Sequence, residues 1–214
     1  MDEKNTKIIY IVGNAKVDIP YYLLQLGERA GKSILVIDNA KRKTLSDLFA
    51  KEEKDTKDFI EYKSLTIGRN VRYFEEVRGL YDYVFVIKGE SAVYDKWAEH
   101  ADLQIVITNY EKSERQKIKE LIKENIDTDK AFVLFRDKIT SKVSENDILK
   151  EFKMRKAEFN ALVFNDSDYA LYIALLENKK GNVGAVSGEM KEVLQDLSMR
   201  IYGMTDKDFK KFAN

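Results

Sequence analysis

Short apolar runs alternate along the chain with longer stretches in which apolar residues recur every three or four positions. The runs are rich in β-branched and aromatic residues. Most of them lack a strict alternation of apolar and polar positions, which is typical of strands buried on both faces. They cover residues 7–13, 33–38, 81–89, 103–109, 131–135 and 160–164. This pattern predicts a mostly parallel sheet that is flanked by helices.

Three helices are predicted from their apolar stripes and their end signals. The first begins near Pro20, the only proline of the chain, and stops at Gly31, because proline suits a first helical turn and glycine suits a helix end. The second covers residues 111–126 and carries its apolar residues on one face of an otherwise charged helix. The third begins at Ser187. The alternation of strands and helices predicts a doubly wound α/β fold.

Composition narrows the class of protein. A chain of 214 residues with 44% hydrophobic residues is long enough for one well-buried core, so we expect a single domain over residues 1–214. Acidic and basic residues number 37 each, which gives no overall field that would favour nucleic acid or an anionic membrane. The chain has no cysteine and one histidine, His100, which excludes a disulfide framework and a zinc site of several thiolates or histidines. With no apolar run near membrane-spanning length, we expect a cytoplasmic protein and no metal site.

The turn after the first strand is the candidate binding site. In an open α/β sheet this turn faces the ligand crevice, and a phosphate-binding version of it contains glycines, a lysine and a Ser or Thr hydroxyl for Mg²⁺. Here Ala15 replaces a second glycine, Val17 stands where the hydroxyl is needed, and Asp18 adds a negative charge. Lys16 is either a phosphate ligand or a solvated turn residue. The candidate ligands are Gly13, Asn14, Ala15, Lys16, Val17 and Asp18.

Several longer segments carry a family resemblance. "GKSILVID" (31–38) is similar to a family strand written "GKKVLLID", and "YDYVFVIKGES" (81–91) is similar to "YDYIIIDTPPG". "AFVLFRDK" (131–138) is similar to "VLNRVD", and the segment 159–181 is similar to "IPYDEEAVREALNEGKP". In this order and spacing the chain resembles the MinD and ParA family of deviant P-loop ATPases, including the CpaE and TadZ branch. The resemblance implies a P-loop NTPase-like fold.

The resemblance also implies a degenerate site. It places Lys16 at the P-loop lysine and Asp38 at the acidic end of the second strand. The lysine that reaches the partner's nucleotide falls on Ile11, the switch aspartate falls on Lys88, and the base-reading asparagine falls on Phe135. Because hydrolysis depends on charge stabilisation around phosphate and metal, the resemblance implies ATP or ADP binding with weak or absent Mg²⁺, and no catalytic residues. Lys88 either replaces the metal or is a solvated lysine at a strand end.

The resemblance implies a degenerate ATPase that works as a localisation or assembly factor for a bacterial pilus or secretion system. Such a protein binds protein partners and forms a homodimer. The alternative is a genuine ATP-dependent dimerisation switch in plasmid or chromosome partitioning or in protein positioning. A small-ligand enzyme on a doubly wound sheet is a third class, but no nucleophile motif or complete glycine-rich fingerprint favours it.

Three segments leave alternatives open. Asp166 and Asp168 form an acid–base pair or a metal site, or else Asp166 or Ser167 caps the following helix. The polar segment 41–59 is either a mobile insertion or a surface helix. The tail 206–214 is either a weak amphipathic membrane contact or a frayed terminus.

Overall fold

The structure is a computed structural model, and its described residues are 5–13, 16–40, 44–49, 59–69, 77, 79–90, 95–139, 142–177 and 180–213. The predictions for Asn14 and Ala15 lie outside the described residues. Of the segment 41–59, only residues 44–49 and Phe59 are described.

The described residues form one eight-stranded sheet in the order β3-β4-β2-β5-β1-β6-β7-β8. Its strands are β1 (Lys7–Gly13), β2 (Ile34–Asp38), β3 (Phe59–Tyr62), β4 (Leu65–Arg69), β5 (Tyr83–Gly89), β6 (Leu103–Thr108), β7 (Ala131–Lys138) and β8 (Glu158–Val163). All neighbouring strands are parallel except β3 and β4. The six predicted strands are confirmed, as is the mostly parallel sheet. The edge hairpin of β3 and β4 was not predicted.

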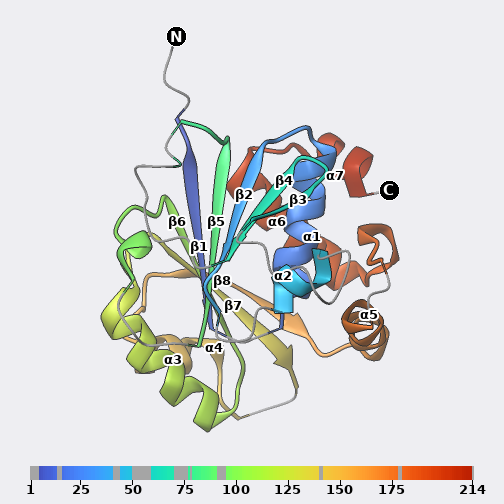
Figure 1. Cartoon of the computed structure of the whole chain (residues 1–214). Helices are drawn as coiled ribbons and strands as arrows, with labels where there is room; N and C mark the ends of the chain where they lie inside the picture. Colours follow the sequence, from blue (N-terminus) through green and yellow to red (C-terminus); the bar gives the residue numbers. More distant parts are fainter. Residues whose placement is uncertain are drawn as a thin grey trace.

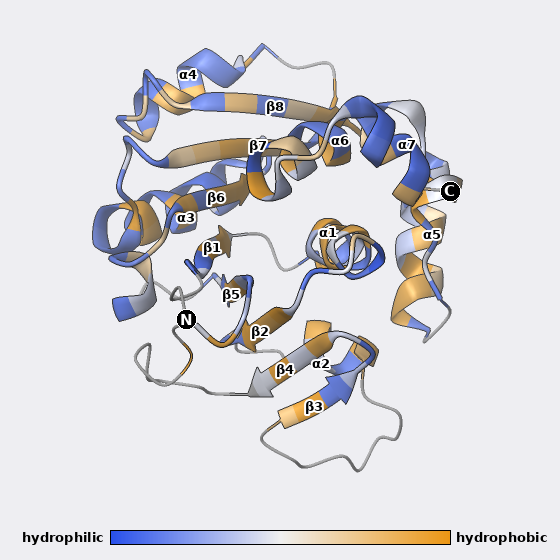
Figure 2. Ribbon diagram, turned by 90° about the horizontal axis from the view of Figure 1, so that it is seen from above, coloured by the Kyte–Doolittle hydropathy of each residue, from blue (hydrophilic) through white to orange (hydrophobic). Residues whose placement is uncertain are grey.

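Helices cover both faces of the sheet (Figure 1). The described helices are α1 (Asp18–Arg29), α2 (Thr44–Phe49), α3 (Lys112–Asn125), α4 (Glu145–Glu151), α5 (Asp166–Leu176), α6 (Gly188–Tyr202) and α7 (Asp206–Ala213), with short 3-10 turns η1 (Lys96–Ala98) and η2 (Val183–Ala185). The helices α1, α2, α5, α6 and α7 contribute to one apolar core, whereas η1, α3 and α4 contribute to a second core on the opposite face. Figure 2 shows this division into two layers about the sheet. The predicted doubly wound α/β fold is confirmed.

The helix starts follow local capping chemistry. The Ser187 side chain accepts a hydrogen bond from the Met190 N–H at the start of α6, as expected for a serine at this position. At the start of α5 the side chain of Asn165 accepts from the N–H groups of Ser167 and Asp168. The prediction that Asp166 or Ser167 caps α5 is therefore wrong by one or two positions. Asparagine satisfies the free first-turn amides equally well.

The C-terminal segment is a docked helix. Helix α7 packs against α1 and α6, and Phe209 is only 4% exposed within the core. Arg29 Nη1 donates to the Phe212 carbonyl oxygen at 2.6 Å. The prediction of a frayed terminus is therefore wrong, and the Phe209 ring is already buried rather than free to enter a bilayer. None of the helices in the described part of the chain is long and apolar enough to cross a membrane.

Candidate functional site

The candidate site lies at the carboxyl edge of the sheet, where β1 leads into α1. Gly13 is the last residue of β1 and pairs with Ile107 of β6. It has a φ of 107°, and a Cβ added there would overlap the Ile107 carbonyl oxygen. A glycine at this position is therefore required by the close approach of two strands, whether or not a phosphate binds.

A bulge in β7 shapes the other side of the site. The pairing of β7 with β8 shifts register between Phe135 and Lys138, and Asp137 has a φ of 55°. In a regular strand, consecutive side chains point to opposite faces, but a bulge breaks that alternation locally. Arg136 and Asp137 are neighbours in sequence, and both reach the turn that begins α1.

Asp18 and Arg136 form a buried ion pair. Asp18 is 2% exposed and Arg136 is 4% exposed. The two Nη atoms of Arg136 donate to the two carboxylate oxygens of Asp18 in a bidentate arrangement, with Nη2 and Oδ2 2.7 Å apart. Burial by itself would raise the pKa of Asp18, but the charge and hydrogen bonds of Arg136 bring it below its ordinary value. The negative charge that the sequence places in this turn is therefore neutralised inside the protein.

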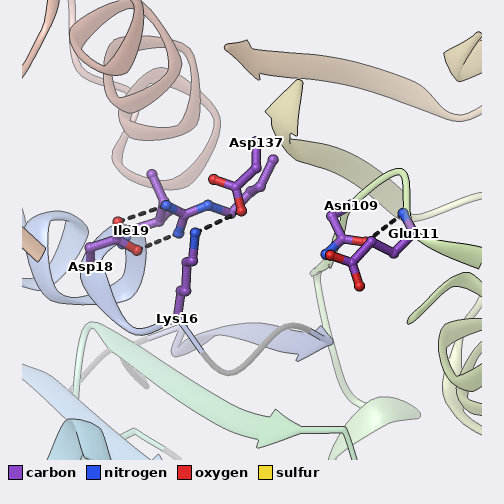
Figure 3. A network of polar contacts seen from close by, with 7 residues as sticks. Lys16, Asp18, Ile19, Asn109, Glu111 and Asp137 are labelled. Atoms are coloured by element: carbon purple, nitrogen blue, oxygen red, sulfur yellow. Dashed lines mark hydrogen bonds and ion pairs between the residues drawn. The ribbon is translucent and has the colours of Figure 1, made fainter. Parts of the chain in front are cut away.

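Lys16 forms a second ion pair beside the first. Its Nζ lies 2.6 Å from Oδ2 of Asp137, and the two side chains are 21% and 28% exposed. The same Nζ lies 5.7 Å from the centre of the Tyr169 ring, within the range of a cation–π contact. Figure 3 shows Lys16 and Asp137 pointing toward one another beside Asp18. Lys16 therefore holds an internal carboxylate where a phosphate loop would hold an anionic ligand.

Little space remains at this point. The cavity between the start of α1, the end of β7 and the connection from β8 to α5 has a volume of about 10 Å³, which is about enough for one water molecule. Lys16, Asp18, Arg136 and Asp137 all line it, together with Tyr169. As arranged, the described residues do not fit a magnesium nucleotide. A phosphate that contacts Lys16 would have to share its ammonium with Asp137 or displace that carboxylate.

The Asp38 carboxylate forms structural hydrogen bonds at the end of β2. It is fully buried, and its Oδ2 accepts hydrogen bonds from the N–H and the hydroxyl of Ser46, at 2.9 and 2.7 Å. Its Oδ1 accepts from the Ala40 N–H at 3.2 Å. These bonds tie the end of β2 to the first turn of α2. The carboxylate thus has a structural use that the sequence did not reveal.

Lys88 points to the other face of the sheet. Lys88 extends toward η1, whose residues Trp97 and Ala98 belong to the core on the α3 side. Its Nζ lies 3.3 Å from Oδ2 of Asp95, and Lys88 is 8% exposed. The interpretation of Lys88 as a solvated lysine is therefore wrong, and the structure does not bring it together with Lys16.

The remaining sequence candidates are structural. Ile11 and Phe135 are 3% and 0% exposed and pack in the two cores. Asp168 accepts hydrogen bonds from the N–H and the hydroxyl of Ser187, at 2.8 and 2.6 Å, which joins the starts of α5 and α6. The hydroxyl position of the loop is taken by Val17, which is 6% exposed. Within the described ranges, no three His, Asp or Glu side chains cluster so that they could hold a metal ion.

Sequence reasoning missed Arg136, Asp137 and Tyr169. Asp18 offered one signal, because a carboxylate at the start of an otherwise buried helix needs a cationic partner. The partner lies 118 positions away in sequence, however, and no local pattern identifies it.

Comparisons with known proteins define the class of the fold. No protein-family model matches the chain, and no curated protein matches it. Among solved structures, the MinD cell division protein of Aquifex aeolicus has a TM-score of 0.65 and 15% identity, over 93% of this chain and 98% of that one. A ParA family ATPase from Chlorobium tepidum TLS has a TM-score of 0.62 and 14% identity, over 91% of this chain and 98% of that one. A chain of a MinC:MinD cell division protein complex from Aquifex aeolicus has a TM-score of 0.61 and 18% identity, over 93% of this chain and 97% of that one.

These likenesses, all below 20% identity, establish the fold alone. The fold is that of a P-loop NTPase, with a mostly parallel sheet between two helical layers. More particularly, it is the fold shared by the MinD and ParA ATPases.

Proposed function

We propose that this chain is a degenerate ATPase of the MinD and ParA type that works through protein contacts rather than through nucleotide hydrolysis. One observation carries the proposal: the Lys16 ammonium is held by the Asp137 carboxylate at 2.6 Å. An incoming phosphate has to compete with this carboxylate for the Lys16 ammonium. Because one anion replaces another at Lys16, the net gain in binding free energy is small.

The neighbouring residues support the same proposal. Val17 offers no hydroxyl for Mg²⁺, and the cation Lys88 stands where the resemblance expects the switch aspartate. Lys88 is itself held by Asp95. Hydrolysis by this fold depends on positioned charges around the phosphates and the metal, and here Lys16 and Lys88 are each paired with a carboxylate of the protein instead.

We infer that the protein is a localisation or assembly factor that acts in the cytoplasm as a homodimer with protein partners. The resemblance to the CpaE and TadZ branch favours pilus or secretion assembly as the process. The fold likeness to a MinC:MinD complex supports a role in protein assembly, because MinD has the same fold and is found there with a protein partner. The inference about the process rests on analogy between folds.

Calorimetric titration with ATP and ADP, with and without Mg²⁺, tests this proposal on three proteins. These are the wild type, Lys16→Ala and Asp137→Asn. We expect no saturable heat from the wild type up to about 1 mM nucleotide, the weak end of specific affinity. We expect Asp137→Asn to gain binding, because it releases Lys16 and keeps the size of the side chain. Lys16→Ala is the matched control and should not bind.

The opposite result has a definite meaning. Saturable binding by the wild type that Lys16→Ala abolishes would overturn the proposal and favour an ATP-dependent dimerisation switch. The position of Lys16 at the start of α1 is the observation that favours this alternative, because a helix N-terminus attracts anions. Light scattering with and without ATP would then show whether the nucleotide changes the oligomeric state.

A further inference from the structure

An exposed apolar surface follows the end of β8 and runs along α5. Of the eleven large hydrophobic residues that are exposed in the described part of the chain, five fall within residues 163–176. We call this surface the α5 stripe. Its members are Val163 at 49% exposure, Phe164 at 42%, Tyr169 at 46%, Ile173 at 41% and Leu176 at 36%. The Phe164 and Tyr169 rings lie 6.0 Å apart, so the stripe is continuous from the strand to the helix.

The α5 stripe has the spacing of a helix that packs against another helix. Tyr169, Ile173 and Leu176 follow one another at intervals of four and three residues, which is the spacing of a coiled-coil seam. The other side of the helix is already used, since Leu175 is buried in the core and Tyr172 packs against it. Helix α5 therefore has apolar residues on two sides, and the described residues cover one of them. In Figure 2 it lies at the outer end of its layer, with much of its ribbon in the hydrophobic colours.

Charge is missing from the α5 stripe. From Tyr169 to Leu176 there is no charged residue, although 35% of the chain is charged. The two aspartates of α5 are at its start, and Asp168 is turned inward to Ser187. Depletion of charge at the centre of a patch is a mark of protein interfaces, and it also removes the like-charge repulsion that would arise if the surface met a copy of itself.

The area of the α5 stripe matches what a dimer needs. A large apolar or aromatic side chain covers roughly 200 Å², so five such chains at 36–49% exposure present on the order of 400 Å². A standard interface buries about 800 Å² on each partner, and somewhat more than half of that is apolar. One α5 stripe with its polar surroundings would supply one side of such an interface.

We propose that the α5 stripe binds a second copy of this chain. The two α5 helices pack antiparallel about a two-fold axis, so that each stripe covers the other and Ile173, at the middle of the seam, lies near its own copy. Such self-complementary contacts are the commonest arrangement in homo-oligomers. The inference rests on the proposed function, which has the chain self-associate, and it adds that the dimer forms without nucleotide through residues 163–176.

Light scattering coupled to size exclusion, without nucleotide, tests the interface. We expect a wild-type dimer at micromolar concentration and a rise of roughly tenfold or more in its dissociation constant for Ile173→Glu, because a charge would enter the centre of the contact. Met199→Glu is the matched control, since Met199 is 49% exposed on α6 and lies outside the stripe. Circular dichroism would show that both variants are folded. A monomeric wild type, or a dimer that Ile173→Glu leaves unchanged, overturns the inference.

Crosslinking gives a second measurement that does not depend on weakening the dimer. The chain has no cysteine, so Ile173→Cys introduces a single thiol close to the proposed axis. Mild oxidation should join two chains rapidly, whereas Met199→Cys should remain a monomer under denaturing electrophoresis. Equal crosslinking of the two variants would contradict the proposed arrangement. Neither light scattering nor crosslinking involves nucleotide. A result that rules out the α5 interface is therefore distinguishable from a calorimetric result that rules out the proposed function.

Discussion

Two adjoining regions of this protein differ in how their side chains are satisfied. In the charge cluster, which comprises Lys16, Asp18, Arg136 and Asp137, each side chain is paired within the cluster. In the α5 stripe, five large apolar side chains are left largely uncovered. Tyr169 belongs to both regions, because its ring lies 5.7 Å from Lys16 Nζ and nearly half of the residue is exposed.

The two proposals assign the contacts of this protein to the α5 stripe rather than to the charge cluster. Where MinD-like ATPases are expected to hold a nucleotide, four charged groups hold one another around a cavity of about 10 Å³. The α5 stripe beside it has the area and the spacing of a protein contact. The following experiments test how far the two regions differ.

The largest effect should come from breaking the buried pair of the charge cluster. Arg136→Met leaves the Asp18 carboxylate buried without its partner, which typically costs about 3–5 kcal/mol of unfolding free energy. The double variant Asp18→Leu with Arg136→Met should recover most of this loss, because apolar replacements of a buried pair are often neutral. Urea denaturation of the wild type and the two variants would measure both effects. A loss below about 1 kcal/mol for Arg136→Met would show that the pair behaves like a surface salt bridge.

Acidification should weaken the same pair. Arg136 lowers the pKa of Asp18 in the folded protein, so the stabilisation is fully present above the unfolded pKa of about 3.9 and is lost as the pH falls through the folded pKa. The difference in unfolding free energy between the wild type and Asp18→Asn should therefore be constant from about pH 5 to 7 and shrink below about pH 4. Urea denaturation across this pH range would measure it. A difference that grows on acidification would contradict the lowered pKa.

The sequence was sufficient for six of the eight described strands and for α1, α3 and α6, because their apolar patterns are local. It was not sufficient for contacts that depend on register. The bulge in β7 turns Arg136 and Asp137 toward the start of α1. The sequence "LFRDK" contains no signal that predicts a bulge. Lys88 was predicted either to replace the metal or to be a solvated lysine, and no local pattern identified its partner Asp95.

A smaller effect is expected from the exposed pair of the charge cluster. Asp137→Asn removes the charge of a partly exposed pair, which is worth at most about 1 kcal/mol, and asparagine tolerates the positive φ of 55°. Asp137→Ala should lose roughly 1 kcal/mol more, because alanine is disfavoured in the left-handed region. Thermal or urea denaturation of both variants would separate the two contributions. Equal stability of the two variants would mean that the bulge relaxes when Asp137 is replaced.

The smallest effect should come from the α5 stripe within a single chain. In a dilute, monomeric sample, Ile173→Glu should change the unfolding free energy by no more than about 0.5 kcal/mol, as is usual for an exposed site. Leu175→Ala on the same helix is the contrast, since Leu175 is 2% exposed and its truncation should cost about 2–5 kcal/mol. Urea denaturation at low protein concentration would measure both. A large loss for Ile173→Glu would show that the stripe is covered within the chain.

The alternation of charge in the cluster has a kinetic consequence. The two cationic and two anionic side chains have a net charge of zero, and the opposite charges lie 2.6–2.7 Å apart. Their electric fields therefore cancel within a distance far shorter than the screening length of about 8–10 Å. A net positive phosphate loop draws anions toward itself from solution, but this arrangement exerts almost no pull beyond its own surface. An anion would reach it by diffusion alone, and its association rate constant would change little with added salt.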